Sequence, residues 1–155
     1  MAKFFSLKPL AHSLLQNFMV DATGKALEGT PGNVTWSPDL PNPRNQAFVA
    51  AWKAKFKRLP TDNEGQAYNG MLVMFEGVKK ANSAKPADVA RALRGATVDT
   101  LYGQATMRAQ DNQLVLPTYA GRVKVVDGQL RPVVEEVFPA SLTPAPSPAC
   151  KMAAG

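Results

Sequence analysis

Apolar side chains recur along residues 61–80 at the spacing of a helix that buries one face. The members of this stripe are Ala67, Tyr68, Met71, Leu72, Phe75 and Val78. Because they lie three or four residues apart, the pattern predicts an amphipathic helix with these side chains in the core. Gly65 and Gly70 are poor helix formers, and either ordinary packing or a close approach to a backbone or ligand would explain them.

Residues typical of helix ends flank this segment, and we expect the rest of the chain to be organised around it. Thr61, Asp62 and Asn63 can each accept a hydrogen bond from the first backbone N–H groups of the helix. Glu64 suits the positive end of the helix dipole, and the lysines at residues 79–80 suit the negative end. The sequence therefore predicts a helix that begins near Thr61 and ends near residue 80.

Helical periodicity also marks residues 9–21, 43–58 and 86–94. In the second segment Asn42 is a suitable cap and Pro43 a suitable first helical residue. Its predicted inward side chains are Phe48, Ala51, Trp52 and Phe56. The first segment carries an apolar stripe of Leu10, Leu14, Leu15 and Phe18.

The period of the apolar pattern changes from about 3.6 to 2 in the last third of the chain, which indicates strands. A strand is predicted at residues 104–109, in addition to a short one at residues 33–36. The Asp-Gly dipeptide at residues 127–128 separates two further runs, residues 119–126 and 129–137. This dipeptide is typical of the tight turn of a β-hairpin.

The composition is that of a folded domain. The chain has 155 residues, of which 45% are hydrophobic and 19% charged. We place the domain at residues 1–138 and expect residues 139–155 to be disordered, because this Pro- and Ala-rich tail has little to bury. No apolar run is long enough to span a bilayer. The first residues lack the features of a signal peptide, so none is expected in this chain.

The net charge of +6 leaves nucleic-acid binding open as a hypothesis, since basic domains hold phosphates on positive surfaces. The basic residues are dispersed along the predicted helices, with one cluster at residues 53–58. Such a run is more often a solvated helix face. We therefore expect no nucleic-acid partner.

A search for reactive groups gives no candidate for catalysis. His12 is the sole histidine and Cys150 the sole cysteine, which excludes a two-histidine metal pair and an intrachain disulfide. Glu135 and Glu136 are adjacent on a predicted strand and point to opposite faces, which argues against a paired-carboxylate site. No glycine-rich phosphate loop is present. We predict that the protein is not an enzyme and uses no metal and no cofactor.

Three features in a fixed order resemble a known family. Pro60 precedes a helix that contains Ala67 and Tyr68, an Ala-Leu-x-Gly helix end follows at residues 92–95, and Asp-Thr-x-x-Gly at residues 99–103 leads into a strand. In this order they resemble the C-terminal half of leucine-binding-protein-like solute receptors. These are the type I periplasmic binding proteins of ABC importers for branched-chain amino acids and related amides.

The resemblance covers residues 10–137 and implies an α/β fold, a partial type I periplasmic binding protein fold with helices packed on a small sheet plus a C-terminal β-hairpin. It implies a fragment of the substrate-binding component of an ABC importer, located in the periplasm, with a small-molecule solute and the ABC permease as partners. In the family the start of the helix after Pro60 can face the ligand, which here maps to Asn63, with Glu64 and Tyr68 adjacent. The alternatives are core packing for Tyr68 and a helix-end charge for Glu64. A polar Asn63 favours an amide or polar solute over a leucine-like side chain.

Two other functions stay open. One is a cytoplasmic sensor of an amide or amino acid with the same fold, which the lack of a signal peptide favours, and the other is the basic nucleic-acid module. If the chain is half of a receptor, part of its helix surface lacks a partner. We then expect an exposed apolar face, through which a homodimer could form. Its predicted members are some of Phe48, Trp52, Met71 and Phe75.

Overall fold

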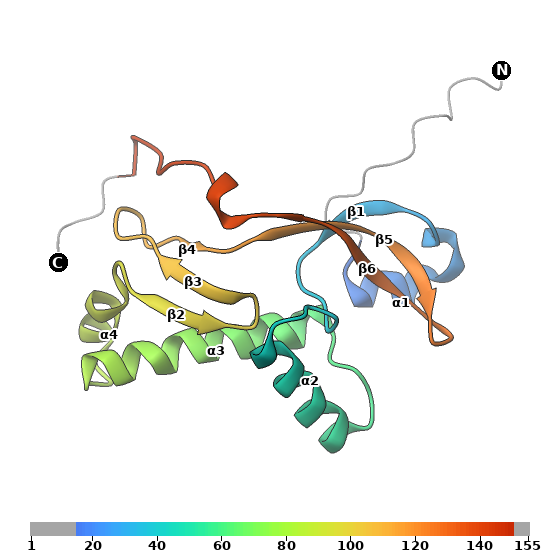
Figure 1. The fold of residues 1–155 in the computed structure, drawn as a ribbon, viewed down its shortest axis with the longest axis horizontal. Helices are drawn as coiled ribbons and strands as arrows, with labels where there is room; N and C mark the ends of the chain where they lie inside the picture. Colours follow the sequence, from blue (N-terminus) through green and yellow to red (C-terminus); the bar gives the residue numbers. More distant parts are fainter. Residues whose placement is uncertain (1–14, 151–155) are drawn as a thin grey trace.

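The computed structural model describes residues 15–150, which form two parts that Figure 1 shows next to each other. The first part is a twisted antiparallel sheet in the order β1-β5-β6, with helix α1 packed against β6. Its elements are α1 (Asn17–Thr23), the short 3-10 helix η1 (Gly24–Leu27), β1 (Pro31–Val34), β5 (Thr118–Val126) and β6 (Gln129–Phe138).

The second part consists of helices beside a smaller antiparallel sheet in the order β2-β3-β4. Helix α3 packs against α4 and β2, and α2 lies beside it. The elements are α2 (Pro43–Phe56), α3 (Asp62–Ala81), α4 (Pro86–Leu93), β2 (Thr97–Thr100), β3 (Gly103–Met107) and β4 (Leu114–Val115). This mixture of helices and small sheets confirms the predicted α/β class.

The predicted hairpin is confirmed, and it is the longest pairing in the molecule. Strands β5 and β6 pair from Thr118 opposite Phe138 to Val126 opposite Gln129. Asp127 and Gly128 both have positive φ, 51° and 76°, which the two-residue turn of a twisted hairpin requires. The register shifts once, at residues 120–121.

Helix α3 confirms the predicted position and ends but not the predicted buried face. The large side chains expected in the core are exposed, with Tyr68 at 42%, Met71 at 45% and Phe75 at 53% of their accessible surface. The buried residues are Asp62, Gly65, Asn69, Val73 and Gly77. These residues also recur at intervals of three or four, so α3 has two regular faces, and the face of small and polar residues points inward.

Close approach of neighbouring elements explains why the small face of α3 is the buried one. A methyl group at Gly65 would lie 2.6 Å from Cε2 of Trp36, and one at Gly77 would lie 2.8 Å from Cγ1 of Val89 on α4. Larger side chains at these positions would overlap the neighbouring atoms. The carbonyl oxygen of the Asn69 side chain accepts a hydrogen bond from the Leu101 backbone N–H at 2.8 Å.

Several smaller predictions need correction. Phe56 and Phe18, both predicted to point inward, are 45% and 53% exposed, and Ala51 is exposed as well. Phe48 is buried as predicted, while the first residues of the predicted helix at 9–21, with His12, lie outside the described residues. After β6 the chain forms a 3-10 helix, η2 (Ala140–Leu142). The proposed domain boundary at residue 138 stays a prediction.

Candidate functional site

The N-terminus of α3 lies where the two parts of the molecule meet, and a capping box fixes its first turn. The Thr61 hydroxyl accepts a hydrogen bond from the Glu64 backbone N–H at 3.4 Å, and the Glu64 carboxylate accepts one from the Thr61 N–H at 2.8 Å. Each side chain thereby satisfies a backbone donor that the helix leaves unpaired. This is the local reason why the helix begins at Asp62.

Glu64 is also held by Arg58, from the loop that joins α2 to α3. The guanidinium group donates to both carboxylate oxygens, at 2.7 and 2.6 Å. This pair lowers the pKa of Glu64 to about 2, with the hydrogen bonds from Arg58 as the largest cause. Glu64 is therefore a permanent negative charge above that pH, and its oxygens serve the fold.

Asp62 connects α3 to two other segments. Its carboxylate accepts a hydrogen bond from the Asn17 backbone N–H at 3.1 Å, and its own N–H donates to the Asn17 side-chain oxygen at 2.9 Å. The Thr35 hydroxyl, just beyond β1, donates to the same carboxylate at 3.3 Å. Asp62 is buried, and these three contacts tie α1, the end of β1 and α3 together.

Two further side chains converge on Thr35. The Gln66 side-chain amide donates to the Thr35 hydroxyl at 3.1 Å, and the Tyr102 hydroxyl donates to the Thr35 carbonyl oxygen at 3.0 Å. Tyr102 stacks on Tyr119 with ring centroids 6.2 Å apart. Burial raises the pKa of Tyr102 far above its ordinary value, so its hydroxyl stays a donor at physiological pH.

An open cavity of about 430 Å³, the tyrosine cavity, borders this network. Pro139 and residues 142–144 form part of its wall, and the guanidinium group of Arg108 donates to the Pro144 carbonyl oxygen at 2.6 Å. Asp111 holds Arg108 through two hydrogen bonds, which lower the pKa of Asp111. The remaining lining includes Asn33, Gln66, Tyr102, Gln113, Leu116 and Tyr119. Among the described residues that line this cavity, none carries a charge.

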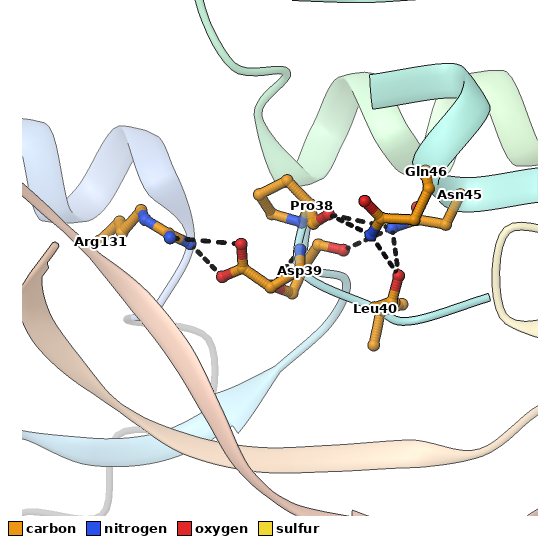
Figure 2. Close-up of polar contacts among 7 residues, drawn as sticks. Pro38, Asp39, Leu40, Asn45, Gln46 and Arg131 are labelled. Atoms are coloured by element: carbon orange, nitrogen blue, oxygen red, sulfur yellow. Dashed lines mark hydrogen bonds and ion pairs between the residues drawn. The ribbon is translucent and has the colours of Figure 1, made fainter. Parts of the chain in front are cut away.

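A second cavity of about 580 Å³, the arginine cavity, also borders the start of α3. Its wall includes Asn17, Asp21, Arg58, Thr61 and Arg131. Figure 2 shows how Arg131, from β6, pairs with Asp39 at 2.5 Å. The described wall of the arginine cavity carries charged side chains as well as polar ones, whereas the described wall of the tyrosine cavity carries only uncharged polar and apolar ones.

Asn45, the third residue of α2, fixes the turn that carries Asp39. Its side-chain amide donates to the carbonyl oxygens of Ser37, Pro38 and Leu40 at 3.1–3.3 Å, and Gln46 donates to Leu40 beside it (Figure 2). The Asn45 oxygen accepts from the indole N–H of Trp36 at 3.0 Å. Asn45 is fully buried, so this segment between the two parts is rigidly held.

The three residues predicted to meet a ligand lie at the start of α3 but do not line either cavity. Asn63 is exposed, Glu64 is half-buried in its pair with Arg58, and Tyr68 stacks on Phe48 at 4.3 Å. The structure thus supports the helix-end role for Glu64, and it places Tyr68 on the surface rather than in the core. Their contact with a solute stays a prediction.

Asp62, Gln66, Thr35 and Tyr102, which the structure brings together, were not expected at a site. Asp62 was expected only as a helix cap, and nothing in the local sequence links Thr35 to a helix 27 residues further on. Among residues 15–150, no three His, Cys, Asp or Glu side chains form a possible metal site. Within the same range, every helix is too short or too polar to cross a membrane.

The chain belongs to the periplasmic binding protein family, whose model, described as "Periplasmic binding protein", matches residues 5–129. No curated protein matches the chain. Three solved structures of binding proteins illustrate the likeness in fold, and most of this chain matches each of them.

The solute binding protein of an ABC transporter from Rhodopseudomonas palustris BisB5, in complex with 3,4-dihydroxy benzoic acid, is 25% identical with a TM-score of 0.71; the match covers 82% of this chain and 35% of that one. The leucine-, isoleucine-, valine-, threonine- and alanine-binding protein from Brucella ovis is 22% identical with a TM-score of 0.70. This match covers 90% of this chain and 38% of that one. The ABC transporter substrate-binding protein from Sphaerobacter thermophilus is 18% identical with a TM-score of 0.75. This match covers 87% of this chain and 38% of that one.

The chain therefore spans just over a third of the length of these relatives. Their likeness confirms the predicted partial periplasmic binding protein fold and the resemblance found in the sequence. The family is one of periplasmic binding proteins.

Proposed function

We propose that this chain is part of the substrate-binding component of an ABC importer that takes up a branched-chain amino acid or a related amide. The observation that carries the proposal is the family match over residues 5–129, together with solved relatives in complex with small molecules. The permease of that importer is the proposed protein partner, and the periplasm is the proposed location.

The proposed solute contact is the first turn of α3, at Asn63. This side chain is exposed at the positive end of a helix dipole, where negative groups such as a carboxylate are stabilised. Its amide can both donate and accept, which suits an amide solute. Glu64 follows Asn63 directly in the chain and Tyr68 lies five residues further along α3; in this proposal Glu64 acts through its charge and Tyr68 through its ring.

Isothermal titration with leucine, leucinamide and 4-hydroxybenzoate tests the proposal. We expect heat from leucine or leucinamide at up to millimolar concentration, and weaker heat from 4-hydroxybenzoate. Asn63→Ala should weaken the amide or amino acid by about tenfold, the value of one or two lost hydrogen bonds. Gln104→Ala, an exposed amide on β3 far from α3 in sequence, is the matched control and should change nothing.

Two results would contradict the proposal. If neither leucine nor leucinamide gave heat, the solute would not be a branched-chain amino acid or a related amide. An unchanged affinity in Asn63→Ala would remove the first turn of α3 from the site, and the two cavities would then be the regions to vary next.

A further inference from the structure

The tyrosine cavity is bordered by a buried side chain whose polar group has no partner. Tyr119, on β5, is only 5% exposed, yet within residues 15–150 its hydroxyl makes no hydrogen bond; the bond from Asn33 goes to its backbone carbonyl oxygen. The unpaired side-chain atoms that are fully enclosed in this range are Nε1 of Trp52 and Oδ1 of Asn112. The Tyr119 hydroxyl is not one of them, so it meets open space, where it can bond to a bound molecule.

Tyr102 holds the Tyr119 ring in place and leaves this hydroxyl available. The two rings stack with centroids 6.2 Å apart, and the Tyr102 hydroxyl already donates to the Thr35 carbonyl oxygen at 3.0 Å. Burial raises the pKa of Tyr119, so its hydroxyl keeps its proton at physiological pH. Of the two tyrosines in the wall, Tyr119 is therefore the one that can still donate a hydrogen bond.

The rest of the wall favours an uncharged, largely apolar molecule. Leu114, Leu116 and Pro117 contribute apolar surface, and the polar residues described in the wall are amides and hydroxyls. Placing an ion against such a wall without an opposite charge is strongly unfavourable. An aromatic ring packs well on aliphatic and tyrosine side chains and brings no charge of its own.

A segment from the C-terminal region completes the cavity. Pro139, Leu142, Thr143 and Pro144 belong to the wall, and Arg108, which follows β3, donates to the Pro144 carbonyl oxygen at 2.6 Å. Asp111 fixes the Arg108 guanidinium group through hydrogen bonds of 2.9 and 2.6 Å. These wall residues lie beyond residues 5–129, which match the family model, so this side of the cavity is built outside the matched region.

A third cavity, of about 380 Å³, also borders Tyr119 but has a different wall. It includes Arg122, Glu135 and Glu136, and Arg122 pairs with Glu135 at 3.2 Å. A charged molecule would be better accommodated there than in the tyrosine cavity, so the charge of the ligand separates the two cavities.

We propose that the tyrosine cavity binds an uncharged aromatic molecule that carries an amide or hydroxyl group, with the Tyr119 hydroxyl as its hydrogen-bond partner. Asn63, the proposed solute contact, does not line this cavity. The two sites are therefore separate, and either can be wrong without the other.

Isothermal titration with 4-hydroxybenzamide and 4-hydroxybenzoate tests the proposal. The two molecules share a ring and a hydroxyl, but the second carries a carboxylate in place of the amide. We expect 4-hydroxybenzamide to bind at millimolar concentration and 4-hydroxybenzoate to bind at least about tenfold more weakly. An excess of leucine should not displace 4-hydroxybenzamide, because leucine is proposed to bind elsewhere.

Two variants locate the bound molecule. Tyr119→Phe removes only the hydroxyl and should weaken 4-hydroxybenzamide by about tenfold, the value of one hydrogen bond. Gln113→Trp, at an exposed position that lines the tyrosine cavity and not the third one, should block binding by its bulk. Thr97→Val removes an exposed hydroxyl on β2 outside all three cavities and is the matched control. Circular dichroism shows whether each variant is folded.

Four results would overturn the proposal. The first is that 4-hydroxybenzamide gives no heat, and the second is that the amide and the acid bind equally well. The third is an unchanged affinity in folded Tyr119→Phe. The last is full binding in folded Gln113→Trp, which would place the molecule outside the tyrosine cavity.

Discussion

The two faces of α3 have opposite chemistry, and the difference shows which property decides burial in this molecule. The outer face holds aromatic and methionine side chains that are about half exposed, whereas the inner face holds glycine, asparagine and aspartate. The inner face brings Trp36, α4 and the Leu101 backbone into close contact with the helix. Close packing and satisfied backbone groups thus outweigh hydrophobicity here. Four substitutions break or sharpen this comparison.

Gly65→Ala should have the largest effect, a loss of about 3 kcal/mol in the free energy of unfolding. The new methyl group would overlap the indole ring of Trp36, which cannot move aside because Asn45 holds its N–H. Urea denaturation followed by circular dichroism measures the loss. An unchanged midpoint would show that the inner face is not tightly packed.

Asn69→Ala should cost about 2 kcal/mol, because the buried Leu101 N–H would lose its acceptor. The same denaturation experiment applies. Asn63→Ala, at an exposed position of the same helix, is the matched control and should stay within about 0.5 kcal/mol. Similar losses in Asn69→Ala and Asn63→Ala would mean that the hydrogen bond from the Leu101 N–H to Asn69 adds no measurable stability.

Gly70→Ala should stabilise the protein by about 1 kcal/mol, because no atom lies within 4 Å of the added methyl group and alanine favours the helix. It makes the same change as Gly65→Ala five residues further along. Opposite signs in the two variants are therefore the sharpest test of the two faces, and a loss in both would contradict the assignment.

Glu64→Gln should have the smallest effect, about 1 kcal/mol or less at pH 7, since its pair with Arg58 is partly exposed. The pKa of Glu64 falls from an ordinary value of about 4.3 to about 2 on folding. The charge therefore stabilises the fold above pH 4, and this contribution is lost as the pH falls to about 2. The melting temperatures of the parent protein and Glu64→Gln should differ at pH 7 and be equal at pH 2. An equal difference at both pH values would show that the charge of Glu64 is not the source of the stabilisation.

Local signals in the sequence predicted most elements of the fold. Thr61 with Glu64 marked the start of α3, Asn42 with Pro43 marked the start of α2, and the Asp-Gly dipeptide marked the hairpin. The orientation of α3 could not be predicted in this way. Two regular faces compete on that helix, and the deciding contact, Trp36 on Gly65, joins residues that are distant in the sequence.

The candidate site was predictable only in its location. The resemblance to solute receptors pointed to the first turn of α3, and the structure places that turn at the junction of the two parts. The network around Thr35 depends on Asn17, Asp62 and Tyr102, which come from three separate segments. No pattern within one segment can reveal such a set, because chain folding alone brings it together.

The pairing of β1 with β5 has a consequence for biosynthesis. Asn33 pairs with Ala120, and its side-chain amide donates to the carbonyl oxygen of Tyr119, 86 residues later in the chain. At a synthesis rate of about 5–20 residues per second, β1 leaves the ribosome roughly 4–17 seconds before the strand that completes it. During that interval its edge is open to other chains. Slower translation of residues 34–118 should therefore increase aggregation of the nascent protein.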